Sequence, residues 1–322
     1  MHVTATADEW VEGMISAFPD FVADCELRGD VFSLRIIQTD KLPDPPDLPL
    51  TWEGRMPDGY QGRILEAEDE AYLTVEDRVA VSWSYRYKDA KAFVLPDSQS
   101  EFFTSAAIAV IDAALARDGQ YLLHGACLVD RQSNRVILIC APSGAGKTTT
   151  SMALAHDGFS LVTDDASVVI PAGSAALAWG LPRALKVHRK TAELLPWVGQ
   201  MQDCWDASGE QAVPLADLAG RLSTAKPAAR EVAAVVLLGP RSAGGHVVER
   251  LSKADLLMAL AHDNVAARPG GMTIKAQARF EALAEVVARV PALMLSAGTE
   301  LRTLPGILAE ALEQHALQVV AR

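Results

Sequence analysis

The chain has 322 residues, half of them apolar, and carries 41 acidic against 29 basic side chains, a formal net charge of −12 at pH 7. This length accommodates two domains, and the acidic balance argues against nucleic acid as a partner. The longest apolar runs, such as residues 232–238, are too short to span a bilayer, and residues 1–20 lack the basic-then-apolar pattern of a signal peptide. We therefore expect a cytoplasmic protein with no membrane partner.

The N-terminal third holds nearly all the negative charge. Residues 1–100 contain 20 acidic and 9 basic residues, a net charge of −11. Such a surface could hold a basic peptide or protein, or it could only keep the domain in solution. In the same third, Trp10, Met14 and Phe18 recur every four residues, as in a short amphipathic helix.

Strand patterns and prolines also mark this third. Residues 31–37, 78–87 and 91–95 predict strands, and the four prolines of residues 41–50 predict an irregular loop between them. The sequence thus predicts a small β-rich domain over residues 1–98 and a second domain over residues 99–322.

The most informative segment lies at residues 136–150. An apolar run, a glycine-bearing turn and a Lys-Thr pair opening a helix form a P-loop, in which Ala141 stands where the full pattern has its first glycine. Alanine can occupy this position if the residue needs no positive φ. Backbone N–H groups of the turn and the helix N-terminus would hold phosphates, Lys147 would neutralise them, and Thr148 would bind Mg²⁺. The expected nucleotide-binding residues are Ser143, Gly144, Ala145, Gly146, Lys147, Thr148 and Thr149.

The surrounding elements predict an α/β fold. Residues 121–129 and the P-loop strand, joined by a short polar turn, predict an antiparallel hairpin. A helix over residues 148–155 then leads to a strand over residues 159–163, which ends in Asp164-Asp165. A strand–helix–strand unit brings its two strands parallel, so the P-loop and the two carboxylates should share one edge of the sheet.

Further helices and strands follow in the second domain. Ser100 and Thr191 are the expected N-caps of two helices. The remaining predicted helices cover residues 100–117, 215–222, 252–262, 275–290 and 304–317, and the remaining strands cover residues 231–238 and 292–295. Cys25, Cys127, Cys140 and Cys204 show no metal-ligand spacing, and two of them lie in apolar runs, as buried cysteines do.

Phosphoryl transfer to a hydroxyl requires a phosphate cradle, a metal, a base and a cation for the transferring group. Thr148 and one carboxylate of the Asp164-Asp165 pair would bind Mg²⁺, and the other carboxylate would be the base. Arg183 or Lys186, from a basic run, would be the cation, and His124 would orient a carboxylate or hold a phosphate oxygen. Each has a plainer explanation: a structural histidine, a turn-forming Asp pair and a solvated basic face.

The order of His124-Gly125, the P-loop and Thr163-Asp164-Asp165 resembles the bacterial HPr serine kinase/phosphorylase family. The resemblance implies a P-loop core like that of HPr kinase and phosphoenolpyruvate carboxykinase. It also implies that Asp164 is the base and that His124 and Asp165 support it. The metal ligands would then be Asp165 and Thr148. The resemblance further implies that copies of the chain assemble into a homo-oligomer. Residues 179–186 and the Ala/Leu-rich C-terminal helices look more like the subgroup found with ribosomal peptide pathways, including lasso-peptide kinases. The family's downstream glycine-rich arginine segment has no match here.

We therefore predict an ATP- and Mg²⁺-dependent serine kinase acting on a hydroxyl of a peptide or small protein, for example a lasso-peptide precursor. The acidic N-terminal domain is a candidate docking surface for that substrate. Two alternatives remain open. One is a nucleotide-binding regulatory module that transfers no phosphate, and the other is a true HPr kinase/phosphorylase.

Overall fold

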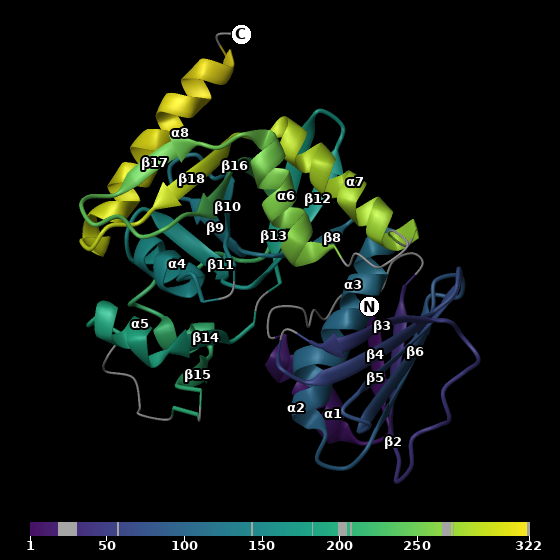
Figure 1. Ribbon diagram of the computed structural model, residues 1–322. Coiled ribbons are helices and arrows are strands. Elements are labelled where there is room, and N and C mark those ends of the chain that lie inside the picture. Colours follow the sequence, from purple (N-terminus) through teal and green to yellow (C-terminus); the bar gives the residue numbers. More distant parts are fainter. Residues whose placement is uncertain are drawn as a thin grey trace. The chain divides into compact units, whose positions relative to one another are not determined.

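The chain forms two compact units, Met1–Asp118 and Gly119–Arg322 (Figure 1). The computed structural model describes residues 1–18, 31–56, 58–142, 144–181, 183–198, 205–206, 208–265, 272 and 274–320. The unit boundary falls after the helical segment of residues 99–117, which the sequence analysis assigned to the second domain. In the structure Phe102 of this segment is fully buried and packs edge-on against Trp10, with ring centroids 5.7 Å apart.

The first unit is built on a seven-stranded sheet with the order β1-β2-β7-β6-β5-β4-β3. Its strands are β1 (His2–Ala5), β2 (Ser33–Gln38), β3 (Leu50–Arg55), β4 (Gln61–Glu66), β5 (Glu70–Val75), β6 (Val79–Ser84) and β7 (Asp89–Val94). β1, β2 and β7 pair in parallel, and the remaining neighbours pair antiparallel. The first unit is rich in strands, and of these only β2, β6 and β7 were predicted from the sequence.

Helices complete this unit. They are α1 (Asp8–Ala17), α2 (Gln99–Glu101), a π-helical turn (Phe102–Ala106) and α3 (Ala107–Arg117). Trp10 and Met14 of α1 are buried as predicted, and the Trp10 Nε1–H donates to Gln38 Oε1 at 2.7 Å. The predicted cap at Ser100 is wrong, because the helix begins at Gln99 and the Ser100 hydroxyl lies 2.7 Å from that of Tyr60.

The second unit contains a nine-stranded mixed sheet in which seven strands follow one another in the order β11-β9-β10-β16-β13-β12-β8. Of the other two strands, β18 pairs with β16, and β17 pairs with β18. The strands are β8 (Tyr121–His124), β9 (Ala126–Asp130), β10 (Val136–Cys140), β11 (Phe159–Thr163), β12 (Ala166–Ala172), β13 (Ala175–Gly180), β16 (Arg230–Leu238), β17 (Val247–Arg250) and β18 (Ala292–Ser296). The predicted hairpin is confirmed, because β9 and β10 pair antiparallel. β9 also pairs antiparallel with β11, so β10 and β11 run in the same direction with β9 between them.

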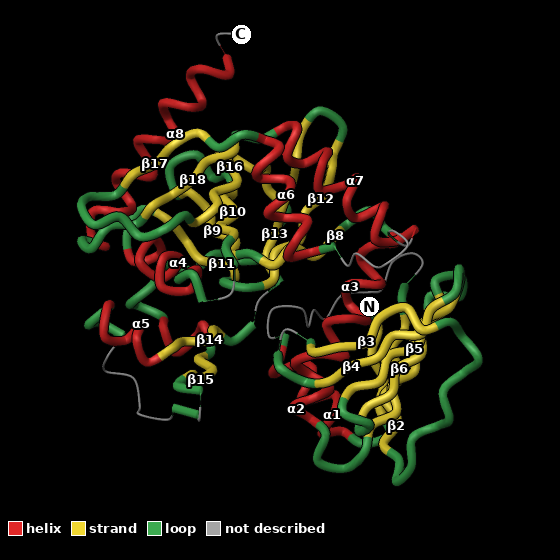
Figure 2. The backbone as a smooth tube through the Cα atoms, in the orientation of Figure 1, coloured by secondary structure: helices red, strands yellow, loops and turns green. Residues whose placement is uncertain are grey.

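Helices cover both faces of this sheet (Figure 2). They are α4 (Lys147–His156), α5 (Arg189–Leu194), α6 (Lys253–Asn264), α7 (Ile274–Arg289) and α8 (Leu304–Val320), with 3-10 turns at Leu215–Leu218 and Leu301–Thr303. A small two-stranded sheet of β14 (Leu185–His188) and β15 (Glu210–Val213) lies beside them. The predicted cap of α5 at Thr191 is wrong, because His188 precedes the helix and its ring accepts from the Lys190 N–H at 3.1 Å.

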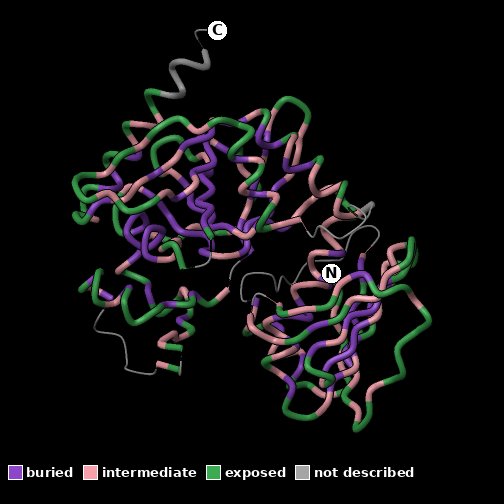
Figure 3. The backbone as a smooth tube through the Cα atoms, in the orientation of Figure 1, coloured by how far each residue is buried: buried purple, intermediate pink, exposed green. Residues whose placement is uncertain are grey.

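The P-loop strand β10 is buried on both sides, which explains its uninterrupted apolar sequence (Figure 3). Ile137 and Ile139 belong to the apolar cluster shared with α4 and α8, whereas Leu138 belongs to the cluster shared with α6 and α7. Successive side chains of a strand point to opposite faces, so β10 holds the two helical layers together.

The cysteines that the structure describes are structural. Cys127 and Cys140 are buried, and burial raises the pKa of each thiol to about 12, so both stay protonated and unreactive. Cys25 and Cys204 lie outside the described residues. Over the described ranges, no helix combines the length and the apolarity needed to cross a membrane.

Candidate active site

The P-loop connects β10 to α4 in the conformation that its glycines require. Gly144 has φ +77° and Gly146, the N-cap of α4, has φ +98°, values that side chains disfavour. Ala141 is 1% exposed and is not among the described residues with positive φ, which confirms that alanine is acceptable there. Ser143 lies outside the described residues.

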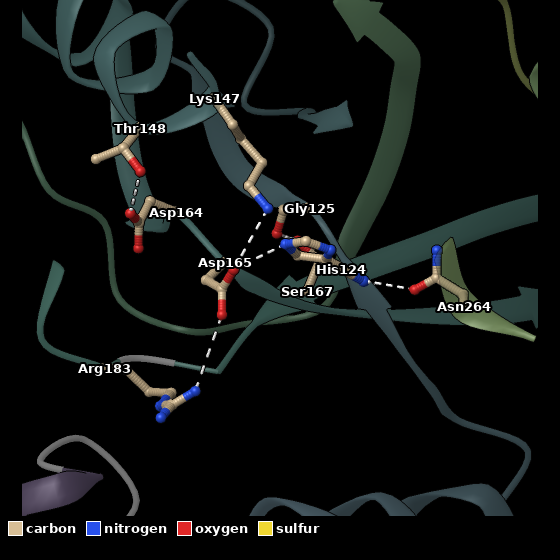
Figure 4. Close-up of polar contacts among 9 residues, drawn as sticks. All are labelled: His124, Gly125, Lys147, Thr148, Asp164, Asp165, Ser167, Arg183 and Asn264. Carbon is tan, nitrogen blue, oxygen red and sulfur yellow. Dashed lines mark hydrogen bonds and ion pairs between the residues drawn. The ribbon is translucent and has the colours of Figure 1, made fainter. Parts of the chain in front are cut away.

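The two carboxylates lie at the same edge of the sheet as the P-loop, as predicted. Asp164 and Asp165 follow β11, whose carboxyl end faces the same way as that of β10. Asp164 is 3% exposed and accepts a hydrogen bond from the Thr148 hydroxyl, with Oγ1 and Oδ2 2.8 Å apart (Figure 4). The structure therefore places Thr148 against Asp164, not against Asp165.

Asp165 is surrounded by nitrogen donors (Figure 4). Its Oδ1 lies 3.1 Å from His124 Nε2 and 3.3 Å from Lys147 Nζ. Its Oδ2 lies 3.9 Å from Arg183 Nη1. The Asp165 side chain is 45% exposed, so a molecule arriving from solvent can reach it while these neighbours hold it in place.

His124 reaches Asp165 because two strands break at the same level. The predicted strand of residues 121–129 is interrupted at Gly125, and the chain around Asp164-Asp165 is interrupted in the same way between β11 and β12. The Gly125 N–H donates to the Asp165 carbonyl at 2.9 Å, and His124 is in register with Ala166 across β8 and β12. A Cβ on Gly125 would lie 3.0 Å from Cys140 Sγ and 3.2 Å from the Ile139 carbonyl oxygen, so the junction packs closely against the P-loop strand.

Two polar side chains that the sequence analysis missed fasten this junction (Figure 4). Asn264, the last residue of α6, accepts a hydrogen bond of 2.7 Å from the His124 backbone N–H through its Oδ1. Ser167 is buried and donates to the Gly125 carbonyl at 2.7 Å. Neither residue belongs to a local motif, because each bond joins residues more than 40 positions apart.

The pKa values of the two carboxyl groups are shifted in opposite directions. Burial, together with the negative charge of Asp165, raises the pKa of Asp164 to about 6, although the Thr148 hydrogen bond acts in the other direction. Burial also tends to raise the pKa of Asp165, but the hydrogen bond from His124 and the charges of Lys147 and Arg183 outweigh it and hold that pKa below its usual range. Near neutral pH, Asp165 is therefore a fixed anion, while Asp164 is close to taking up a proton.

The remaining predicted residues have different surroundings. Arg183 contacts Asp165, whereas Lys186 is exposed on β14. The Thr149 hydroxyl lies 2.7 Å from that of Thr191 in α5 and is thereby engaged away from the turn. Ala145 follows Gly144 in the turn, and its N–H bonds the Pro142 carbonyl at 3.2 Å.

The donor set suits a magnesium ion that arrives with a nucleotide. Thr148 and Asp164 offer two oxygen ligands side by side, and Mg²⁺ is commonly held by one or two carboxylates together with substrate phosphates. Among the residues that the structure describes, no group of three or more His, Cys, Asp or Glu side chains is arranged to hold a metal by itself. The site thus has the parts of a nucleotide-phosphate site: a glycine turn, a lysine, a hydroxyl and two carboxylates.

No family model matches the sequence, and no curated protein matches it. Among solved structures, the HPr(Ser) kinase/phosphatase of Coxiella burnetii matches with a TM-score of 0.30 and 13% sequence identity, over 62% of this chain and 97% of that chain. A similarity this low assigns the chain to no family.

Proposed function

We propose that the protein is an ATP-dependent kinase that phosphorylates a serine or threonine hydroxyl of a peptide or small protein. The observation that carries the proposal is the contact of Asp164 with Thr148 and of Asp165 with Lys147, which joins both acidic side chains to the P-loop. A protein that only senses a nucleotide needs the P-loop but has no use for an accessible carboxylate beside it.

The contacts favour Asp164 as the metal ligand and Asp165 as the base, the reverse of the roles that the family resemblance implies. Asp164 is buried beside Thr148, so these two are the residues that would hold Mg²⁺. The ion would neutralise charge on the phosphate oxygens when bound. Because a metal ligand must be deprotonated, we expect metal binding to lower the raised pKa of Asp164.

Asp165 is the carboxylate that an acceptor hydroxyl could reach. It is ionised and partly exposed, and His124 holds it by a contact of 3.1 Å. In the proposed step, Asp165 accepts a hydrogen bond from the acceptor hydroxyl, the acceptor oxygen bonds the γ-phosphorus, and the bond from that phosphorus to the ADP oxygen breaks. Asp165 receives the hydroxyl proton as the new bond forms, because the bond to phosphorus makes the hydroxyl strongly acidic. Lys147 and Arg183 lie on the two sides of Asp165, where they can meet the charge of the transferring group.

The acceptor is proposed from the sequence. The order of His124-Gly125, the P-loop and Asp164-Asp165 supports a kinase like the HPr enzymes, and the segment of residues 179–186 supports a ribosomal peptide precursor, such as a lasso-peptide precursor, as the substrate. Residues 1–100, with a net charge of −11, are the candidate docking surface for a basic part of that substrate.

Incubation with Mg·ATP and a panel of peptides that includes HPr, read by mass spectrometry, tests the proposal. We expect one phosphate to be added to a hydroxyl of an accepted peptide by the wild type, and loss of that product in Asp165→Asn with ATP binding retained. ATP binding without a phosphorylated product across a broad panel would favour the regulatory module. Phosphorylation of HPr alone would identify an HPr kinase.

A further inference from the structure

A second loop, residues 239–246, reaches the P-loop edge of the sheet. β16 pairs in parallel with β10, with Cys140 opposite Leu237. Since the two strands end at the same level, the loop of residues 239–246 leaves the sheet beside the P-loop. This loop has the sequence Gly-Pro-Arg-Ser-Ala-Gly-Gly-His, and its single cation is Arg241.

The Arg241 side chain extends to the start of α4. Its Nη2 lies 3.9 Å from the position that a Cβ on Gly146 would occupy. Gly146 is the last residue of the phosphate-binding turn, directly before Lys147. Arg241 is exposed and forms no ion pair with any residue in the described ranges.

The loop holds this arginine in a defined place. The Gly239 N–H donates to the Leu295 carbonyl at 2.9 Å, and the Ser242 N–H donates to the Ala297 carbonyl at 3.0 Å, so both flanks of Arg241 are attached to the β18 end. A Cβ on Gly298 would lie only 2.4 Å from the Gly244 carbonyl oxygen, which shows how closely the loop packs there. Pro240 further restricts the backbone immediately before the arginine.

The charge of Arg241 can serve a ligand, because the other cations of the site already contact a carboxylate. Lys147 and Arg183 both contact Asp165, so part of their charge is already balanced. A nucleoside triphosphate brings more negative charge than one lysine and a helix N-terminus neutralise, and a guanidinium binds two phosphate oxygens at once. We propose that Arg241 binds the phosphate chain of the nucleotide from the side of Gly146, an inference that rests on the proposed nucleotide-binding function.

Binding measurements with Mg·ATP and with inorganic triphosphate, which has no base or sugar, test this inference. For Arg241→Gln we expect the Kd of both ligands to rise about tenfold or more, because a charge-assisted hydrogen bond is lost. Arg241→Lys should recover part of the affinity. The matched control is Arg302→Gln, because Arg302 is exposed and lines a cavity with His156 and Asp157, at the opposite end of α4 from the P-loop.

The outcomes separate this inference from the function on which it rests. If the wild type binds both ligands and Arg241→Gln binds them equally well, the role of Arg241 is overturned and the nucleotide site stands. If Arg241→Gln weakens only ATP and not inorganic triphosphate, Arg241 contacts the base or sugar and the inference is wrong. If the wild type binds neither ligand, the nucleotide site fails, and the role of Arg241 fails with it. Unfolding of Arg241→Gln without ligand should match the wild type, because the side chain is exposed.

Discussion

The Thr148 hydroxyl donates to the Asp164 carboxylate across 2.8 Å, and this bond ties the first turn of α4 to the end of β11. Both oxygens can then face one cation at the P-loop. The neighbouring Asp165 lies among His124, Lys147 and Arg183 instead. Asp164 and Asp165, although adjacent in the sequence, thus lie in two different environments.

Asp164→Asn should raise the Mg²⁺ concentration needed for phosphoryl transfer by about tenfold or more, because a neutral amide is a poorer ligand than a carboxylate. A Mg²⁺ titration at saturating ATP and peptide measures this. Asp165→Asn is the matched control in a Mg²⁺ titration of ATP binding, where its midpoint should be unchanged. If Asp165→Asn shifts the midpoint and Asp164→Asn does not, the roles of the two carboxylates are those expected from the family resemblance.

Asp164 should lower the stability of the metal-free protein as pH rises. Its pKa in the folded state, about 6, lies above the unfolded value, so its contribution to stability is fully present below the unfolded pKa and is lost as pH rises through 6. Relative to the wild type, Asp164→Asn should therefore gain stability between pH 4 and pH 7, by on the order of 1–3 kcal/mol. Denaturant unfolding at both pH values in a chelator measures the gain. A difference between the variants that is independent of pH would mean that Asp164 ionises normally.

Asn264 should act as a positioning residue for His124. Asn264→Ala removes the acceptor that holds the His124 backbone N–H, so we expect the kcat of peptide phosphorylation to fall about tenfold or more while the Kd of ATP is unchanged. Asn264→Asp keeps an acceptor oxygen and should retain more activity. In a His124→Ala background the Asn264→Ala change should have little further effect, because the two residues act through one contact. Equal losses in both backgrounds would contradict this role.

Restoring the glycine of the full P-loop pattern should bring no benefit. Ala141 is buried and its φ is not positive, so Ala141→Gly removes a buried methyl group and adds backbone freedom. We expect the free energy of unfolding to fall by about 1 kcal/mol with an unchanged Kd for ATP. Gly144→Ala is the contrasting variant, because φ +77° strains any side chain there and nucleotide affinity should drop. Tighter ATP binding by Ala141→Gly would show that the alanine limits the loop.

Local sequence patterns predicted the elements that strong periodicity marks. The P-loop strand, its hairpin with β9, and the proximity of Asp164 and Asp165 to Lys147 all follow from an apolar run, a short turn and one crossover. Strands β1, β3, β4 and β5 of the first unit were missed, and β3 and β4 show why. Each contains a glycine and charged residues, and the sheet places them at or near its edge, where alternation is weak.

The directions of side chains and their partners far away in the chain could not be predicted from the sequence. Asp164 and Asp165 are chemically identical neighbours, and only the strand geometry decides which faces α4 and which faces His124. The choice of Arg183 over Lys186 at Asp165 depends in the same way on the backbone between them. Asn264 and Arg241 are more than 90 residues from the groups that they approach, and no local spacing links such pairs.

The shared break of the strands at Gly125 and Asp165 has a consequence for how His124 is held. Backbone bonds, from the Gly125 N–H to the Asp165 carbonyl and from the His124 N–H to Asn264, keep the imidazole next to the carboxylate. The distance between the two side chains is thus set by these backbone bonds as well as by their own contact of 3.1 Å. The imidazole therefore stays beside the carboxylate when a ligand that enters the site changes the charge around it.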